Sequence, residues 1–387
     1  MKVLRIKQLK IFILAQALSL CAFTCSDESP TGYDTPYAYT VPTQTDDGWE
    51  TAALTDVGID ETPISQFMNE LLNTIDHRIH GILIIKNSRL VLEEYFSGYQ
   101  FYHGPFTQFN RETRHNLASV TKSFTSALTG LAIDYGFIAG VNQKVFSFFP
   151  EYSELNNQQK DRITLKHLLT MTAGLQWDES SIPYTDPRND IAQLFQQDDP
   201  IRFILCKPVA TEPGVHFLYN GGCTNVIGEI IRKTSGLTVD DFSAAYLFTP
   251  LGISDYQWQE LPHEVIYTSG DLRLRPRDMA KLGAVYLNGG LWKDQLIISK
   301  EWIEVSTKPF IHATPELEYG FQWWVYNFEF DSVPLKSFSA RGWGGQNIIV
   351  FPDLDLVVIT TAGYYDEPGL EYHINDLLIP AILSAVL

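Results

Sequence analysis

Two hairpin-like patterns near opposite ends of the chain limit its fold more than any other feature. The first is GILIIKNSRLVLEEYF, residues 81–96, with a turn at residues 86–89. The second is NIIVFPDLDLVVITTAG, residues 347–363, with a turn at residues 352–355. Runs of Ile, Val and Leu on both sides of a short polar turn are typical of paired antiparallel strands. We therefore expect both ends of the chain to contribute strands to one antiparallel sheet.

The segments between and around these hairpins have mostly helical spacing. Residues 56–75 predict a helix, and residues 119–290 are largely helical with loops marked by Pro and Gly. The closing residues 372–387 also have helical spacing, but Pro380 should kink or break that helix. The pattern predicts an α+β fold in which the antiparallel sheet is flanked by helices. A mostly helical subdomain would be inserted at about residues 135–270.

The N-terminus predicts export from the cell. Residues 1–24 have a basic start followed by an apolar run too short for a comfortable membrane span, as in a signal peptide. The following Cys25 resembles the lipidated cysteine of a bacterial lipoprotein, and the acidic residues after it resemble the export tag of Gram-negative surface lipoproteins. We expect a flexible tether at 25–55 and a catalytic domain at 56–387. The predicted location is the cell envelope, periplasmic or surface-exposed.

Charge and cysteine content narrow the class of protein. The formal net charge is −18, and residues 1–24 carry four basic residues and no acidic one, so their removal leaves a still more acidic chain. This charge argues against nucleic acid or an anionic membrane surface as partner. A membrane contact would be made only through the anchor at Cys25. Within the folded body, Cys206 and Cys223 could form a disulfide or could be two small buried residues.

The stretch ASVTKSFTSALTG, residues 118–130, contains the candidate nucleophile. Ser119 and Lys122 are three residues apart, so on a helix they lie on nearly the same face. A desolvated lysine can accept the proton of a serine hydroxyl, and the first turn of a helix stabilises a negative oxygen. On the motif alone, the solvated edge of a helix is the simpler interpretation.

Several longer stretches carry a resemblance that reverses this interpretation. They resemble, in order and spacing, the class C β-lactamase-like serine hydrolases, which include D-alanyl-D-alanine carboxypeptidases, β-lactamases, esterases and nylon-oligomer hydrolases. The resemblance covers roughly residues 60–385. The matching stretches are LASVTKSFTSALTGLAIDYG, ITLKHLLTMTAGLQW, PGVHFLYNGGCTNVIGEIIRKTSG, LFTPLGISD, LRLRPRDMAKLGAVYLNGGLW and YGFQWW. The resemblance implies that Ser119 and Lys122 are catalytic.

The second element that the resemblance implies is a tyrosine, usually in Tyr-x-Asn. The matching stretch is FLYNGG, so Tyr219 takes the place of the catalytic tyrosine. A tyrosine beside a lysine can carry the proton from the serine to the leaving group. The sequence departs from the family at Gly221, where the asparagine would contact a substrate amide. Asn220, one position earlier, is a candidate replacement.

The third implied element is a strand edge, for which the matching stretch is ARGWGGQNIIVF. The family's Lys-Thr-Gly is absent, and Gly342, Trp343 and Gly344 resemble the form found in nylon-oligomer hydrolases and some esterases. A backbone N–H near Trp343 would pair with that of Ser119 to hold an oxyanion. Further candidates for the pocket are Arg341, which could replace the missing lysine, and two aromatic residues, Trp177 and Tyr184.

The resemblance implies hydrolysis through an acyl-enzyme without a metal or an organic cofactor. The two departures favour an ester or a small amide as substrate over a β-lactam. One alternative is a D-alanyl-D-alanine carboxypeptidase or a weak β-lactamase. A second is an inactive relative that binds peptides or glycopeptides, although an inactive site usually loses one of its catalytic residues.

Overall fold

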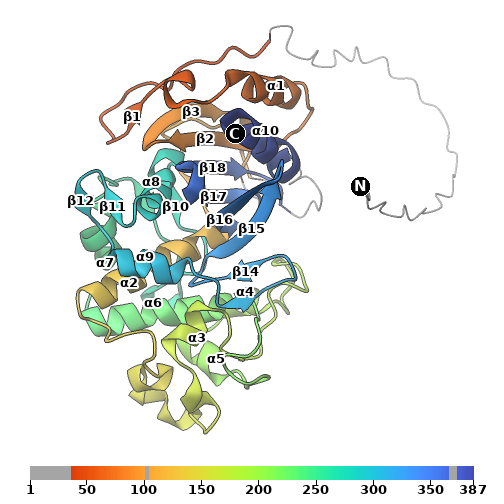
Figure 1. The fold of residues 1–387 in the computed structure, drawn as a ribbon. Coiled ribbons are helices and arrows are strands. Elements are labelled where there is room, and N and C mark those ends of the chain that lie inside the picture. The colour runs from red at the N-terminus through yellow and green to blue at the C-terminus, as the bar shows by residue number, and fades with distance from the viewer. Residues whose placement is uncertain (1–35, 101–103, 366–372) are drawn as a thin grey trace, which may run out of the picture. The chain divides into compact units, whose positions relative to one another are not determined.

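The computed structural model describes residues 36–100, 104–365 and 373–387 (Figure 1). Tyr37–Leu387 form one compact unit. The predicted signal peptide at 1–24, the predicted lipidation site Cys25 and the start of the predicted tether lie outside the described residues. In the part of the chain that is described, no helix is long and apolar enough to cross a bilayer.

Among the described residues, nine strands form one sheet to which both ends of the chain contribute. The two predicted hairpins are confirmed, as β2–β3 and β17–β18, and β18 pairs with β2 through Val358 opposite Ile84. All neighbours are antiparallel except the edge pair β1–β3. The strands are, in spatial order, β1 (Glu50–Thr51), β3 (Arg89–Tyr95), β2 (Ile79–Lys86), β18 (Leu356–Ala362), β17 (Gln346–Phe351), β16 (Val333–Gly342), β15 (Trp324–Phe330), β14 (Glu318–Tyr319) and β13 (Ile311–His312).

Shorter strands form small sheets outside the main one. They are β6 (His115–Asn116), β10 (Arg273–Leu274) and β7 (Tyr256–Gln257) in one sheet, and the pairs β4 (Ser97–Tyr99) with β5 (Phe106–Gln108), β8 (Glu260–Leu261) with β9 (Val265–Ile266), and β11 (Leu291–Trp292) with β12 (Gln295–Leu296). The α-helices are α1 (Glu61–Leu72), α2 (Thr121–Asp134), α3 (Leu165–Leu169), α4 (Asp190–Leu194), α5 (Pro200–Cys206), α6 (Gly221–Ser235), α7 (Val239–Ser243), α8 (Pro276–Leu287), α9 (Lys300–Ser306) and α10 (Ile379–Val386).

The first residues of two predicted helices explain where those helices start. The helix predicted at 56–75 is shorter as α1, because the Asp60 side chain caps its first turn by accepting from the Thr62 N–H at 2.9 Å. The break predicted at Pro380 takes the form of a new helix start. The segment His373–Leu378 is a π-helical turn, and α10 follows with Pro380 in its first turn, where a missing N–H costs nothing.

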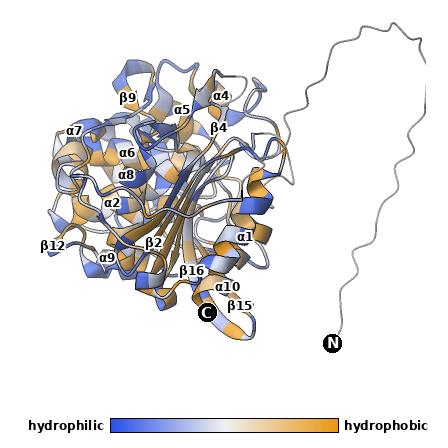
Figure 2. Ribbon diagram, turned by 90° about the horizontal axis from the view of Figure 1, so that it is seen from above, coloured by the Kyte–Doolittle hydropathy of each residue, from blue (hydrophilic) through white to orange (hydrophobic). Residues whose placement is uncertain are grey.

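The sheet separates two hydrophobic cores because successive strand residues point to opposite faces. In β18, Leu356 and Val358 pack with α1 and α10, while Val357 and Ile359 pack with α2 and α8. Figure 1 shows α1 and α10 close together beside the first strands, and Figure 2 shows hydrophobic residues along the central strands. Helix α2 contacts both β16 and α6, so its first residues lie where the sheet meets the helical region.

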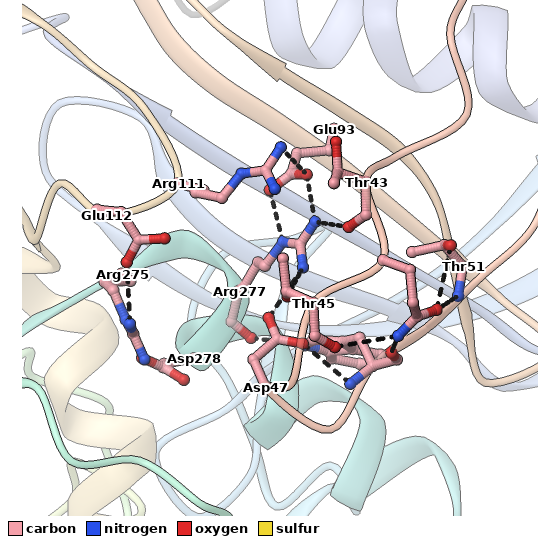
Figure 3. Close-up of polar contacts among 12 residues, drawn as sticks. Thr43, Thr45, Asp47, Thr51, Glu93, Arg111, Glu112, Arg275, Arg277 and Asp278 are labelled. Atoms are coloured by element: carbon pink, nitrogen blue, oxygen red, sulfur yellow. Dashed lines mark hydrogen bonds and ion pairs between the residues drawn. The ribbon is translucent and has the colours of Figure 1, made fainter.

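Residues 37–51 differ from the flexible tether predicted for 25–55, because they pack on the domain. The Tyr39 hydroxyl donates to the Val91 carbonyl at 2.8 Å, and the Trp49 ring is buried with its Nε1–H on the Arg277 carbonyl at 3.0 Å. Figure 3 shows the Arg277 guanidinium held by this segment and by Glu93. The polar composition of this segment predicted a flexible tether, but its aromatic and charged side chains bind the domain.

Candidate active site

Ser119 lies in a tight turn that leads into α2. The turn is a 3₁₀ segment, Ala118–Val120, and Ala118 has a φ of 45°, which is uncommon for a residue with a side chain. Asn116 stabilises this backbone, because its Oδ1 accepts from the Ala118 N–H at 2.8 Å while its Nδ2 donates to Asp271 at 2.8 Å. Such strained positions persist only where neighbouring groups hold them, and they cluster at functional sites. The turn therefore orients Ser119 at the start of α2.

Lys122 is buried, which excludes the solvated helix edge. The side chain is 3% exposed, and its Nζ donates to Ser119 Oγ at 3.0 Å and to the Ser269 carbonyl at 2.7 Å. Burial lowers the pKa of Lys122 to about 8, although the carboxylates of Glu179 and Asp271 oppose this shift. About a tenth of this lysine is therefore the neutral amine at pH 7, far more than for a solvated lysine, and that amine can accept the proton of Ser119.

Tyr219 lies beside the same pair of residues. Lys122 Nζ is 4.8 Å from the centroid of the Tyr219 ring. Burial and the Glu179 carboxylate raise the pKa of Tyr219 well above its usual range, although the nearby Ser119 hydroxyl opposes the rise. The phenol is therefore neutral and can both donate and accept a proton. Lys122 thus contacts both of the other residues predicted to be catalytic.

The end of β16 approaches the backbone of Ser119 closely enough to require glycine. A Cβ on Gly342 would lie 2.4 Å from the Leu117 carbonyl oxygen and 3.2 Å from Ser119 N. Gly344 has a φ of 86°, which favours glycine in the turn after the strand. Trp343 lies between these glycines. The predicted strand-edge residues therefore border the Ser119 N–H, where an oxyanion would be held.

At Gly221, where the family has an asparagine, the backbone contacts a buried acid, Glu179, that the sequence alone did not indicate. The Gly221 N–H and Trp177 Nε1–H both donate to Glu179 Oε2 at 2.6 Å. Trp177, predicted as a candidate for the pocket, is instead a core residue that is 4% exposed, and its indole N–H binds the Glu179 carboxylate. The only signal in the sequence was the acid in QWDE, and nothing local indicated its distance from Gly221 or Lys122.

Two other candidates each have one polar atom engaged in a structural contact. Asn220 is 2% exposed, and its Oδ1 caps α6 by accepting from the Cys223 N–H at 3.0 Å, so this oxygen is not available to a substrate amide. Arg341 is half-buried, and its Nε donates to Ser339 Oγ at 2.9 Å, two residues back on β16. This contact turns part of its guanidinium toward the strand itself.

Aromatic rings from separate segments lie around these residues. Trp324 stacks on Tyr219 with ring centroids 6.0 Å apart. Trp343 packs against Tyr184 at 5.1 Å and against Tyr365 at 5.0 Å. Of these residues, only Tyr365 is buried, at 7% exposed. The other rings remain partly accessible, so they line the site with apolar surface.

Cys206 and Cys223 are both free thiols, one exposed and one buried, so the alternative of a disulfide is not realised. Among the described residues, no group of His, Cys, Asp and Glu side chains is placed to hold a metal ion.

The fold and the arrangement around Ser119 define a serine hydrolase of the β-lactamase type. The model of one protein family, described as Beta-lactamase, matches residues 64–369, and the chain belongs to this family.

Individual relatives agree with this assignment. The chain is 24% identical to the 6-aminohexanoate-dimer hydrolase of Paenarthrobacter ureafaciens, over 76% of this chain and 74% of the relative. It is 26% identical to the lovastatin esterase of Penicillium rubens, over 45% of this chain and 46% of the relative. A solved structure, a putative 6-aminohexanoate-dimer hydrolase from Bacillus anthracis, has the same fold. Its TM-score is 0.66 at 21% identity, and the match covers 81% of this chain and 80% of that one.

Proposed function

We propose that this protein hydrolyses a carboxylic ester or a small amide through an acyl-enzyme on Ser119. The observation that carries the proposal is the buried Lys122, whose Nζ lies 3.0 Å from Ser119 Oγ and next to the Tyr219 ring. A solvated lysine would be fully protonated near neutral pH and could not act as a base. The named activities of the two relatives, one on an amide and one an esterase, support the same reaction class.

The groups around Ser119 suit both halves of such a reaction. Neutral Lys122 accepts the hydroxyl proton while Oγ bonds to the substrate carbonyl carbon, and the N–H groups of Ser119 and Trp343 hold the resulting oxyanion. The proton passes through the Tyr219 hydroxyl to the leaving alcohol or amine, whose bond to the carbonyl carbon breaks. Water then attacks the acyl-enzyme, gives its proton to the same relay, and releases the carboxylic acid and Ser119.

The surroundings of Ser119 favour a neutral, partly aromatic substrate. The family's lysine for a substrate carboxylate is absent, and Arg341 is engaged with Ser339. Gly221 has no side chain to contact the amide beside a β-lactam, and Trp324, Trp343 and Tyr184 present aromatic rings instead. These features favour an ester or a small amide over the alternatives, a D-alanyl-D-alanine carboxypeptidase or a weak β-lactamase.

A substrate panel tests this function. We expect turnover of nitrophenyl esters and of a neutral small amide, nitroacetanilide, to exceed turnover of a chromogenic cephalosporin and of a peptide ending in D-alanyl-D-alanine. The Ser119→Ala protein serves as the blank for each substrate. Faster cleavage of the cephalosporin or the peptide would favour the cell-wall alternative. Failure of a fluorophosphonate to label Ser119 would favour an inactive peptide-binding relative.

We also propose that the mature protein is an envelope lipoprotein anchored through Cys25, on the basis of the sequence around residues 1–28. Expressed in a Gram-negative host, the wild type should incorporate labelled palmitate and the Cys25→Ser variant should not. Equal labelling of the two proteins, or none of either, would contradict the anchor.

A further inference from the structure

Glu179 is a buried acid beside the proposed catalytic residues, and two N–H donors hold its carboxylate. The side chain is 2% exposed, and its Oε2 accepts from the Gly221 N–H and from Trp177 Nε1–H, both at 2.6 Å. The Tyr184 side chain lies nearby, and burial together with the Glu179 carboxylate raises the pKa of its hydroxyl. An acid so deeply buried and so fully engaged is costly to keep unless its charge or its position has a use.

The Glu179 carboxylate occupies the space that a side chain at position 221 would fill. A Cβ on Gly221 would lie 2.8 Å from Glu179 Oε2, 3.0 Å from Ile191 Cδ1 and 3.2 Å from Ser269 Oγ. In the family that this chain resembles, an asparagine side chain starts from this position. The polar group next to the lysine and the tyrosine is therefore supplied here by another segment, and it is an acid instead of an amide.

The charge of Glu179 also acts on the proposed catalytic pair. The groups that face Lys122 are Ser119, Tyr219, the Ser269 carbonyl and two carboxylates, those of Glu179 and Asp271. Both carboxylates raise the pKa of Lys122 against the effect of burial, and Glu179 also raises the pKa of Tyr219. Burial raises the pKa of Glu179 itself, while Lys122 and the two N–H donors oppose that rise.

We propose that Glu179 is a positioning residue that orients Tyr184 and the Tyr219 loop and holds the proton on the Lys122–Tyr219 pair, in place of the asparagine side chain that Gly221 lacks. This inference rests on the proposed function. Glu179 acts through other residues and does not itself contact the substrate carbonyl. Its carboxylate binds the N–H of Gly221, two residues after Tyr219. Its charge also acts on Tyr184, which packs on Trp343 at the other side of the site.

The pH dependence of kcat/KM tests the electrostatic part of the proposal. If neutral Lys122 is the base, activity of the wild type should rise with pH through a midpoint near 8, the pKa of this lysine. Glu179→Gln keeps the shape and one acceptor oxygen but removes the negative charge that favours the ammonium. We therefore expect the midpoint to move about one pH unit lower in this variant.

Two matched variants separate charge from packing. Glu93→Gln neutralises another acid with a 2% exposed side chain, which pairs with Arg277 and is not among the groups acting on Lys122. Tyr184→Phe removes the hydroxyl on which the Glu179 charge acts but leaves the carboxylate charged. Both should keep the midpoint of the wild type. A folded Glu179→Gln protein with lower activity but an unchanged midpoint would overturn the proposal.

A second measurement needs no activity and tests whether Glu179 fills the space at position 221. Gly221→Ala should lower the thermal midpoint of unfolding in the wild-type background, because the new Cβ meets Glu179 Oε2. In a Glu179→Ala background the same change should cost clearly less, because only the ends of the Ile191 and Ser269 side chains then lie close to the new Cβ. An equal loss of thermal stability in both backgrounds would contradict the proposal that Glu179 fills the space at position 221. Absence of Ser119-dependent turnover in the wild type would count against the proposed function, and this experiment would still decide the placement of Glu179.

Discussion

Replacing Ser119 with alanine is expected to lower kcat/KM for nitrophenyl esters by at least about 10³-fold, the scale of loss when a covalent nucleophile is removed. Alanine has no atom to attack the substrate, so the acyl-enzyme cannot form. Helix α2 should remain intact, because Ser119 lies in the turn before it and Lys122 keeps its contact with the Ser269 carbonyl. Steady-state kinetics alongside circular dichroism would separate loss of chemistry from loss of fold.

Ser123 on the same helix provides a matched control. It is buried and donates to the Gln322 carbonyl at 2.7 Å, away from the Lys122 amine. Ser123→Ala should therefore retain turnover. Lys122→Met should lose about as much as Ser119→Ala, and combining the two should add little, because residues that act as one unit are not additive. Full activity of Ser119→Ala would mean that another group carries the reaction.

The features predicted correctly from sequence depend on short-range patterns. Both hairpins follow from runs of Ile, Val and Leu around a short turn. The three-residue spacing places Ser119 and Lys122 on one helix face, but that pattern alone favoured a solvated edge, and only the resemblance pointed to the contact that is seen. Tyr219 and the strand edge at Gly342 were found through resemblance, since nothing local connects them with Ser119. The structure brings these segments together where the sheet meets the helical region.

The features missed from sequence depend on contacts between distant segments. Glu179 becomes notable only when its carboxylate is seen against Gly221 and near Lys122. Asn220 looked available as a substrate contact, but a helix begins at the next residue and uses its oxygen as a cap. In both cases the partner of a polar side chain decided its role, and composition does not identify that partner.

The packing of residues 37–51 on the domain leads to the largest expected effect on stability, at Arg277. Its guanidinium is held on several sides at once (Figure 3): Nε and Nη2 donate to Glu93 at 2.7 and 2.5 Å, and Nη1 donates to Asp47 at 2.9 Å and Thr45 at 2.6 Å. The side chains of Arg277 and Glu93 are 4% and 2% exposed. The stability of the fold here therefore depends on buried charges that compensate one another.

Arg277→Met is expected to lower the free energy of unfolding by about 3–5 kcal/mol, because it leaves the Glu93 carboxylate buried without its main partner. Urea denaturation would measure the loss. Arg188→Met is the matched control: its ion pair with Asp186 is on the surface, and its removal should change stability by less than about 1 kcal/mol. Adding Glu93→Met to Arg277→Met should recover part of the loss, since the uncompensated charge is then gone. If Arg277→Met costs no more than Arg188→Met, the buried cluster does not hold residues 37–51 to the domain.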